Sequence, residues 1–114
     1  MKHASAGMVA CMSTELKSTF TPAINHICNT DGKINMLINP MIDFLNNDIN
    51  AEQFENRLYR ALEMCINNPT KKFSDVQLRY TVISTSEDNI SVMSDIVTKV
   101  TNKVRNNYPE LFAK

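Results

Sequence analysis

The sequence predicts an all-α fold, a compact bundle of four to five helices. Glycine and proline, which often mark turns, occur only two and four times in 114 residues, and this scarcity favours helices over a turn-rich sheet. Apolar residues recur along most of the chain at intervals of three and four, the period of a helix with one buried face. They make up 43% of the chain, enough for one hydrophobic core. We therefore expect residues 1–12 to form a disordered N-terminal segment and residues 13–114 a single helical domain.

The first predicted helix extends from Ser13 to Cys28. Ser13 is a suitable N-cap, and the apolar side chains that follow it share one helical face. Pro22 falls inside this pattern, and because proline removes a backbone hydrogen bond, we expect a kink or a new helix start there. Residues 29–32 (Asn-Thr-Asp-Gly) predict a turn before the next helix.

A second helix is predicted from Ile34 to Leu45. Its apolar residues have regular helical spacing: Ile34, Leu37, Ile38, Met41, Ile42 and Leu45. Pro40 interrupts the pattern, and Asn39 before it could cap a new helix that begins with proline. The pattern therefore fits either one helix or two short ones.

The third predicted helix has the clearest start signal in the chain. Asn50 is a good N-cap, and Gln53 three residues later completes a variant of the capping box. Ile49 before the cap and Phe54 after it have the spacing of a hydrophobic staple, which fixes the angle at which the chain enters the helix. An apolar stripe follows, and the helix is expected to end at residues 67–69 (Asn-Asn-Pro).

The segment 74–85 fits either a helix or a short strand. Its apolar residues alternate as in a strand: Val76, Leu78, Tyr80 and Val82. Ser74 and Gln77 also form a capping box, which is a helix signal. A single strand would find no partner elsewhere in this chain, so the helix is the preferred interpretation.

The last helix is predicted to begin near Asp88 or Asn89 and to end near Asn106. Its core stripe repeats in steps of three and four, with two further apolar residues beside it: Ile90, Met93, Val97, Val100 and Val104, widened by Val92 and Ile96.

Composition and motifs argue against an enzyme. Twelve basic and twelve acidic residues balance, with a pI near 6.7, which makes nucleic acid an improbable partner. His26 and Cys28 stand without a second ligand pair, so no metal site is expected, and no phosphate loop or catalytic motif predicts a cofactor. Three cysteines do not form a disulfide framework, so the thiols are expected to be reduced. No apolar stretch reaches the ~20 residues that a membrane helix needs.

One stretch, residues 44–59, resembles the centre of the TAFH domain, also called the nervy homology domain, which occurs in the TBP-associated factor four subunit of TFIID and in ETO-type corepressors. The positions that carry the resemblance are Leu45, Asn46-Asn47-Asp48, Ile49, Ala51-Glu52, Phe54 and Arg57-Leu58. The family usually has glycine-lysine in the turn, where this chain has Asn47-Asp48. The resemblance implies a domain whose apolar groove binds amphipathic helices of transcription factors, and hence a co-regulator in the nucleus, with the cytoplasm as the alternative location.

Apolar side chains that flank a core stripe are candidates for the lip of such a groove. On this argument we expect Met41, Phe44, Leu58 and Tyr59 to help line a partner groove. Such a groove would take a helix through a few anchor side chains.

Two other functions remain open at the level of sequence. One is a structural helical module that self-associates through the stripe from Ile90 to Val104. The other is a small viral or phage factor associated with nucleic acid, which would use Lys99, Lys103 and Arg105.

Overall fold

A computed structural model of the chain describes residues 20, 22–28, 32–68, 73, 76–77, 82 and 85–111. These residues form four α-helices and one short 3-10 helix, and none of them lies in a strand, so the prediction of an all-α bundle is confirmed. The predicted N-terminal segment 1–12 and the predicted helix start at Ser13 lie outside the described residues.

Helix α2 (Pro22–Cys28) begins at the proline where the sequence predicted a kink or a new start. Proline suits the first position of a helix, because its missing N–H would have no partner there and its φ is already helical. Ile24 and Cys28, one turn apart, are completely buried and attach this short helix to the core.

Helix α3 (Lys33–Leu45) is one continuous helix with Pro40 inside it, so the alternative of two short helices is wrong. Tertiary packing outweighs the cost of the proline, because α3 is buried over most of its circumference. Its buried residues include polar ones such as Asn39 and Asp43, which need partners within the protein.

Helix α4 (Ala51–Asn67) begins with both hydrogen bonds of the capping box. The Gln53 backbone N–H donates to Asn50 Oδ1 at 2.8 Å, and the Asn50 backbone N–H donates to Gln53 Oε1 at 3.0 Å. Phe54 is completely buried, and its ring stacks on that of Phe44 with centroids 5.1 Å apart. Ile49 is buried in the same core cluster, so the whole entry to α4 is anchored.

Helix α5 (Glu87–Asn107) begins one residue before the predicted start, because Ser86 caps it by accepting from the Asn89 backbone N–H at 3.1 Å. The Asn89 side chain donates to the carbonyls of Phe44 and Leu45 at 3.4 and 3.3 Å. These carbonyls belong to the end of α3, where a helix leaves its acceptors without partners. Asn89 therefore joins the start of α5 to the end of α3. The 3-10 helix η1 (Pro109–Leu111) follows α5.

The core stripe of α5 faces the interior of the bundle. Met93, Val97, Val100 and Val104 are all buried. The apolar periodicity of the stripe Ile90–Val104 thus marks the core face of the helix, and its buried positions offer no surface for self-association. Self-association through the remaining residues of α5 stays a prediction.

The segment predicted as a helix near residues 74–85 is neither helix nor strand at its described positions, Val76, Gln77, Val82 and Thr85; the rest of it lies outside the described residues. The Asn35 side chain donates to the Val76 carbonyl at 3.2 Å, and the Asn39 side chain to the Gln77 carbonyl at 3.0 Å. These carbonyls are thus paired with side chains of α3, which also satisfies the buried Asn39.

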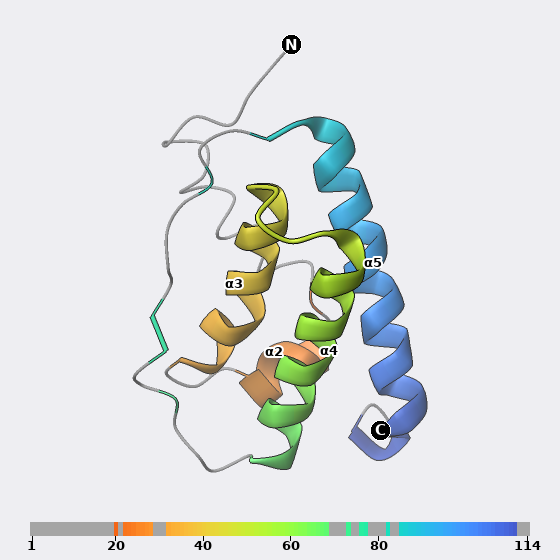
Figure 1. The fold of residues 1–114 in the computed structure, drawn as a ribbon. Helices are drawn as coiled ribbons and strands as arrows, with labels where there is room; N and C mark the ends of the chain where they lie inside the picture. Colours follow the sequence, from red (N-terminus) through yellow and green to blue (C-terminus); the bar gives the residue numbers. More distant parts are fainter. Residues whose placement is uncertain are drawn as a thin grey trace.

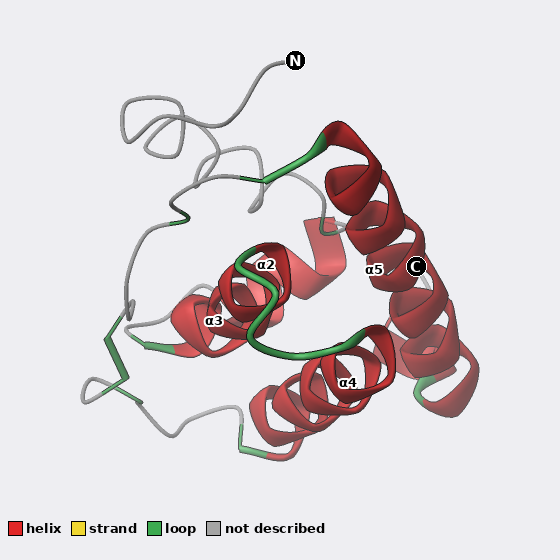
Figure 2. Ribbon diagram, turned by 45° about the horizontal axis from the view of Figure 1, so that its top comes forward, coloured by secondary structure: helices red, strands yellow, loops and turns green. Residues whose placement is uncertain are grey.

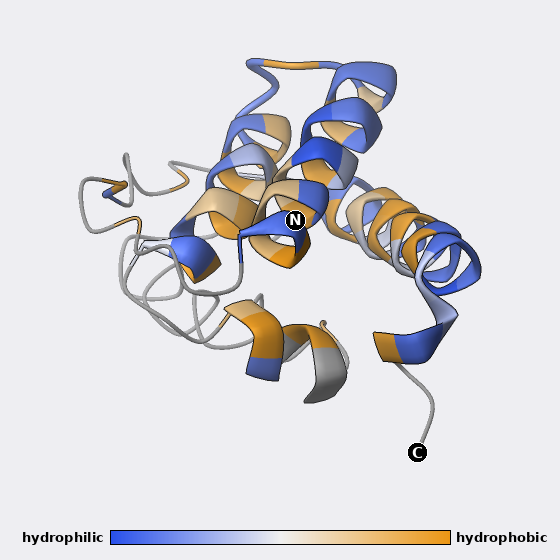
Figure 3. Cartoon of the chain, turned by 90° about the horizontal axis from the view of Figure 1, so that it is seen from below, coloured by the Kyte–Doolittle hydropathy of each residue, from blue (hydrophilic) through white to orange (hydrophobic). Residues whose placement is uncertain are grey.

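Helices α3 and α4 lie side by side, α5 packs along α4, and the short α2 lies behind α4 in the view of Figure 1, in contact with α3 and α4 (Figures 1 and 2). The apolar stripes of the helices face one another in the middle of the bundle (Figure 3). None of the helices in the described part of the chain has the length and apolar character needed to cross a membrane.

Candidate interaction groove between α4 and α5

Three of the four residues expected at a groove lip complete the core instead. Met41 and Leu58 have no exposed surface, and Phe44 is only 6% exposed. The assignment of Met41, Phe44 and Leu58 to a partner groove is therefore corrected. Because α3 is enclosed by several elements, side chains beside its main stripe are buried as well.

The fourth residue, Tyr59, lies half-buried where α4 meets the end of α5. Its hydroxyl accepts a hydrogen bond from Asn107 Nδ2 at 2.6 Å, and Lys103 Nζ lies 4.7 Å from the centroid of its ring. One turn further along α4, the Tyr108 hydroxyl donates to Glu63 Oε2 at 3.2 Å. Local desolvation and the charge of Glu63 raise the pKa of Tyr108. Tyr59, Lys103 and Asn107 form what we term the Tyr59 clasp.

Replacing Tyr59 with alanine should lower the free energy of unfolding by about 1–2 kcal/mol, because it removes one hydrogen bond and one exposed cation–π contact. Denaturant titration measures this loss. Tyr59→Phe keeps the ring under Lys103 and should recover about half of it. If Tyr59→Ala unfolds at the same denaturant concentration as the parent, the clasp does not stabilise the helix pair.

The structure places a groove elsewhere, between the first turns of α4 and the first half of α5. It has a volume of about 490 Å³. We term it the α4–α5 groove, and it is lined by Ala51, Glu52, Glu55, Val92, Asp95, Ile96 and Lys99.

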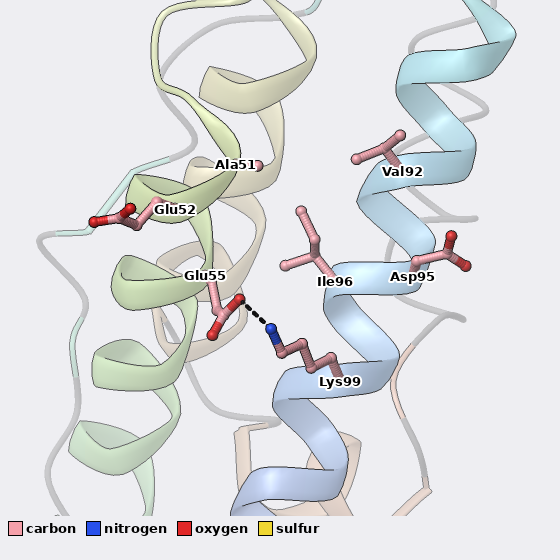
Figure 4. A pocket seen from close by; sticks show the side chains of 7 residues that line it. All are labelled: Ala51, Glu52, Glu55, Val92, Asp95, Ile96 and Lys99. Carbon is pink, nitrogen blue, oxygen red and sulfur yellow. Dashed lines mark ion pairs between the residues drawn. The ribbon is translucent and has the colours of Figure 1, made fainter.

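The walls of the α4–α5 groove are apolar. Val92 and Ile96 are four residues apart on α5, so they share one helical face and point into the space beside Ala51 on α4 (Figure 4). Val92 is 43% exposed and, with Met64 at 46%, is one of the two large apolar side chains that the described part of the chain exposes. The groove thus presents an apolar patch to water.

The rim of the α4–α5 groove is acidic. Glu52 and Asp95 point outward on opposite sides, whereas Glu55 Oε1 pairs with Lys99 Nζ at 3.1 Å and closes one end (Figure 4). Three carboxylates against one ammonium leave an excess of two negative charges. Glu52 lies in the first turn of α4, where the helix dipole favours a negative charge, and Glu55 is paired with Lys99.

A second, smaller pocket of about 340 Å³ lies where α3, α4 and residue 76 meet. It contains the ion pair between Arg57 and the buried Asp43, 3.4 Å apart. The Asn39 side chain beside it already donates to the Gln77 carbonyl. The polar groups of this pocket are thus used to hold the protein together, and they bring no nucleophile next to a base.

In the described ranges, His, Cys, Asp and Glu do not gather in groups of three that could hold a metal ion. Comparison of the chain with protein-family models, with curated proteins and with solved structures gave no match.

Sequence reasoning missed the α4–α5 groove although one signal for it was present. Val92 and Ile96 widen the apolar face of α5 beyond the core stripe, and such extra apolar residues are what an exposed binding face adds to a helix. The sequence could not show that the first turns of α4 lie close enough to α5 to form the opposite wall of the groove.

Proposed function

We propose that this protein is a non-enzymatic protein-interaction domain that binds an amphipathic helix of a partner protein in the α4–α5 groove. The observation that carries the proposal is the exposed Val92 beside the half-buried Ile96 in a groove with an acidic rim. Partner helices bind such grooves by inserting a few apolar anchors, spaced three or four residues apart.

The charge of the rim selects the partner. Glu52 and Asp95 flank the apolar wall, so a helix that carries lysine or arginine beside its apolar anchors meets complementary charge. An acidic helix would instead be repelled. The partner is therefore an amphipathic helix with basic flanks.

The resemblance to the TAFH domain supports a role as a docking domain of a transcriptional co-regulator in the nucleus. The residues that carry it include Phe54, whose buried ring holds the start of α4 in place. That same start supplies Ala51 and Glu52 to the groove. In this proposal the motif sets the position of one groove wall.

The structure offers less support for a nucleic-acid factor. Of the basic residues on α5, Lys99 pairs with Glu55, and Lys103 lies over the ring of Tyr59. Both cations thus have neighbours within the protein, and the groove nearby is acidic.

The test is a titration of isotopically labelled protein with a synthetic amphipathic peptide that has leucines on one face and arginines beside them. Val92→Glu should weaken binding by about tenfold or more, because it puts a charge at an apolar anchor site. Met64→Glu is the matched control, since Met64 is equally exposed but lies near the other end of α4. It should change the affinity less than about twofold.

A second peptide keeps the leucines and replaces the arginines with glutamates. The glutamate peptide should bind more weakly than the arginine peptide, and added salt should reduce the difference between the two affinities. Equal effects of Val92→Glu and Met64→Glu, or stronger binding of the glutamate peptide, would reject the groove as the site.

A further inference from the structure

The α4–α5 groove has two different ends, because α4 and α5 run in the same direction (Figure 1). Lys99 of α5 pairs with Glu55 of α4, and one turn further along both helices Lys103 lies over the ring of Tyr59. The groove lies before these contacts, toward the residues at which both helices begin. We term this side the starting end, and the Glu55–Lys99 pair forms the closed end (Figure 4).

Charge changes sign along the face of α5 that supplies the apolar wall of the groove. Four residues at intervals of four, four and three share this helical face: Asp88, Val92, Ile96 and Lys99. Asp88 is exposed at the starting end, and the Lys99 side chain is 68% exposed at the closed end. The apolar wall thus lies between an anionic and a cationic side chain.

The helix dipoles do not cancel the negative charge at the starting end. The first turns of α4 and α5 each contribute about half a positive elementary charge, together about one. Glu52, Asp88 and Asp95, which lie nearer to the starting end than Lys99 does, bring three full negative charges. At the closed end, Lys99 and Glu55 balance each other. The starting end is therefore net negative, whereas the closed end is neutral.

We propose that the partner helix lies in the α4–α5 groove in the same direction as α4 and α5, with basic residues in its first turns and an acidic residue in its last. This inference rests on the proposed function and adds the direction and the charge order of the partner. The basic residues meet Glu52, Asp88 and Asp95, and the acidic residue lies at Lys99. The partner's own dipole agrees with this direction, since its positive N-terminus lies at the negative starting end.

Lys99 sets the direction of the partner, because it is the one cation among the residues that line the groove. Its ammonium group has three N–H donors, so it can keep the pair with Glu55 and also donate to the partner. A helix leaves the carbonyls of its last turn without partners, and these meet Lys99 only when the partner runs in the same direction as α5. A partner in the opposite direction would bring its basic turns to Lys99.

The test compares two peptides that have the same leucine face and the same composition. One carries arginines in its first turns and glutamates in its last, and the other has the reverse order. The arginine-first peptide should bind the isotopically labelled full chain at least about fivefold more tightly. Helix propensity alone predicts the opposite preference, because the charges of the reversed peptide stabilise its own dipole. A spin label on the N-terminus of the bound arginine-first peptide should weaken amide signals near Asp88 more than those near Lys103, ~22 Å further along α5.

Lys99→Glu should reduce the preference between the two peptides to less than about twofold, because it makes the closed end negative as well. Arg60→Glu is the matched control, since it makes the same change of charge at an exposed position of α4 that does not line the groove, and it should leave the preference unchanged. Equal affinities of the two peptides, tighter binding of the reversed peptide, or a spin label that acts at the other end overturns the proposed direction, while a loss of binding in Val92→Glu still supports the groove. If neither peptide shifts the signals of Val92 and Ile96, the groove and the direction are both wrong.

Discussion

Phe54→Ala is expected to lower the free energy of unfolding by about 3–5 kcal/mol, the usual cost of removing a buried phenylalanine ring from a core. Phe54 has no exposed surface and stacks on Phe44 at 5.1 Å, with the planes inclined by 16°. The substitution removes that contact and leaves a cavity at the entry to α4. A loss of this size is a large part of the total stability of a domain of this length.

Denaturant unfolding of Phe54→Ala against the parent measures this loss, with Arg60→Ala as the control. Arg60 is an exposed residue of the same helix, and its replacement should change the stability by less than about 0.5 kcal/mol. A loss below about 1 kcal/mol for Phe54→Ala would show that the ring does not fill the core as the structure places it.

Gly32→Ala is expected to destabilise the protein by more than about 2 kcal/mol. Gly32 precedes α3 with a φ of +82°, in the left-handed region that glycine adopts without strain. A Cβ atom here would also overlap the backbone carbonyl of Phe73, so the chain at Phe73 would have to move away from α3.

Asn47→Ala separates the cost of a positive φ from the cost of the overlap with the Phe73 carbonyl. Asn47 is exposed and has a φ of +63°, so alanine there meets the backbone strain without being enclosed in the core. It should cost about 1 kcal/mol, clearly less than Gly32→Ala. Equal losses for the two variants in thermal unfolding would show that contact with Phe73 contributes nothing at Gly32.

Only one wall of the α4–α5 groove could be predicted from the sequence. The extra apolar residues of α5, Val92 and Ile96, are visible in the periodicity, but their partner Ala51 lies 41 residues before Val92. Tyr59 was expected at a groove lip because it stands beside a core stripe. The structure shows that Asn107 and Lys103, 48 and 44 residues away, engage it instead.

Local sequence by itself determined the helices and several of their ends. Asn50, Gln53 and Asn67 mark the limits of α4, because capping and helix termination depend on hydrogen bonds between residues three or four apart. Only the tertiary structure decided that α3 continues through Pro40, what course residues 76 and 77 take, and where the groove lies. In each case the deciding contacts join residues far apart in the chain. Burial of α3 outweighs the proline, and the Asn35 and Asn39 side chains engage the carbonyls of residues 76 and 77, a pairing that no local pattern encodes.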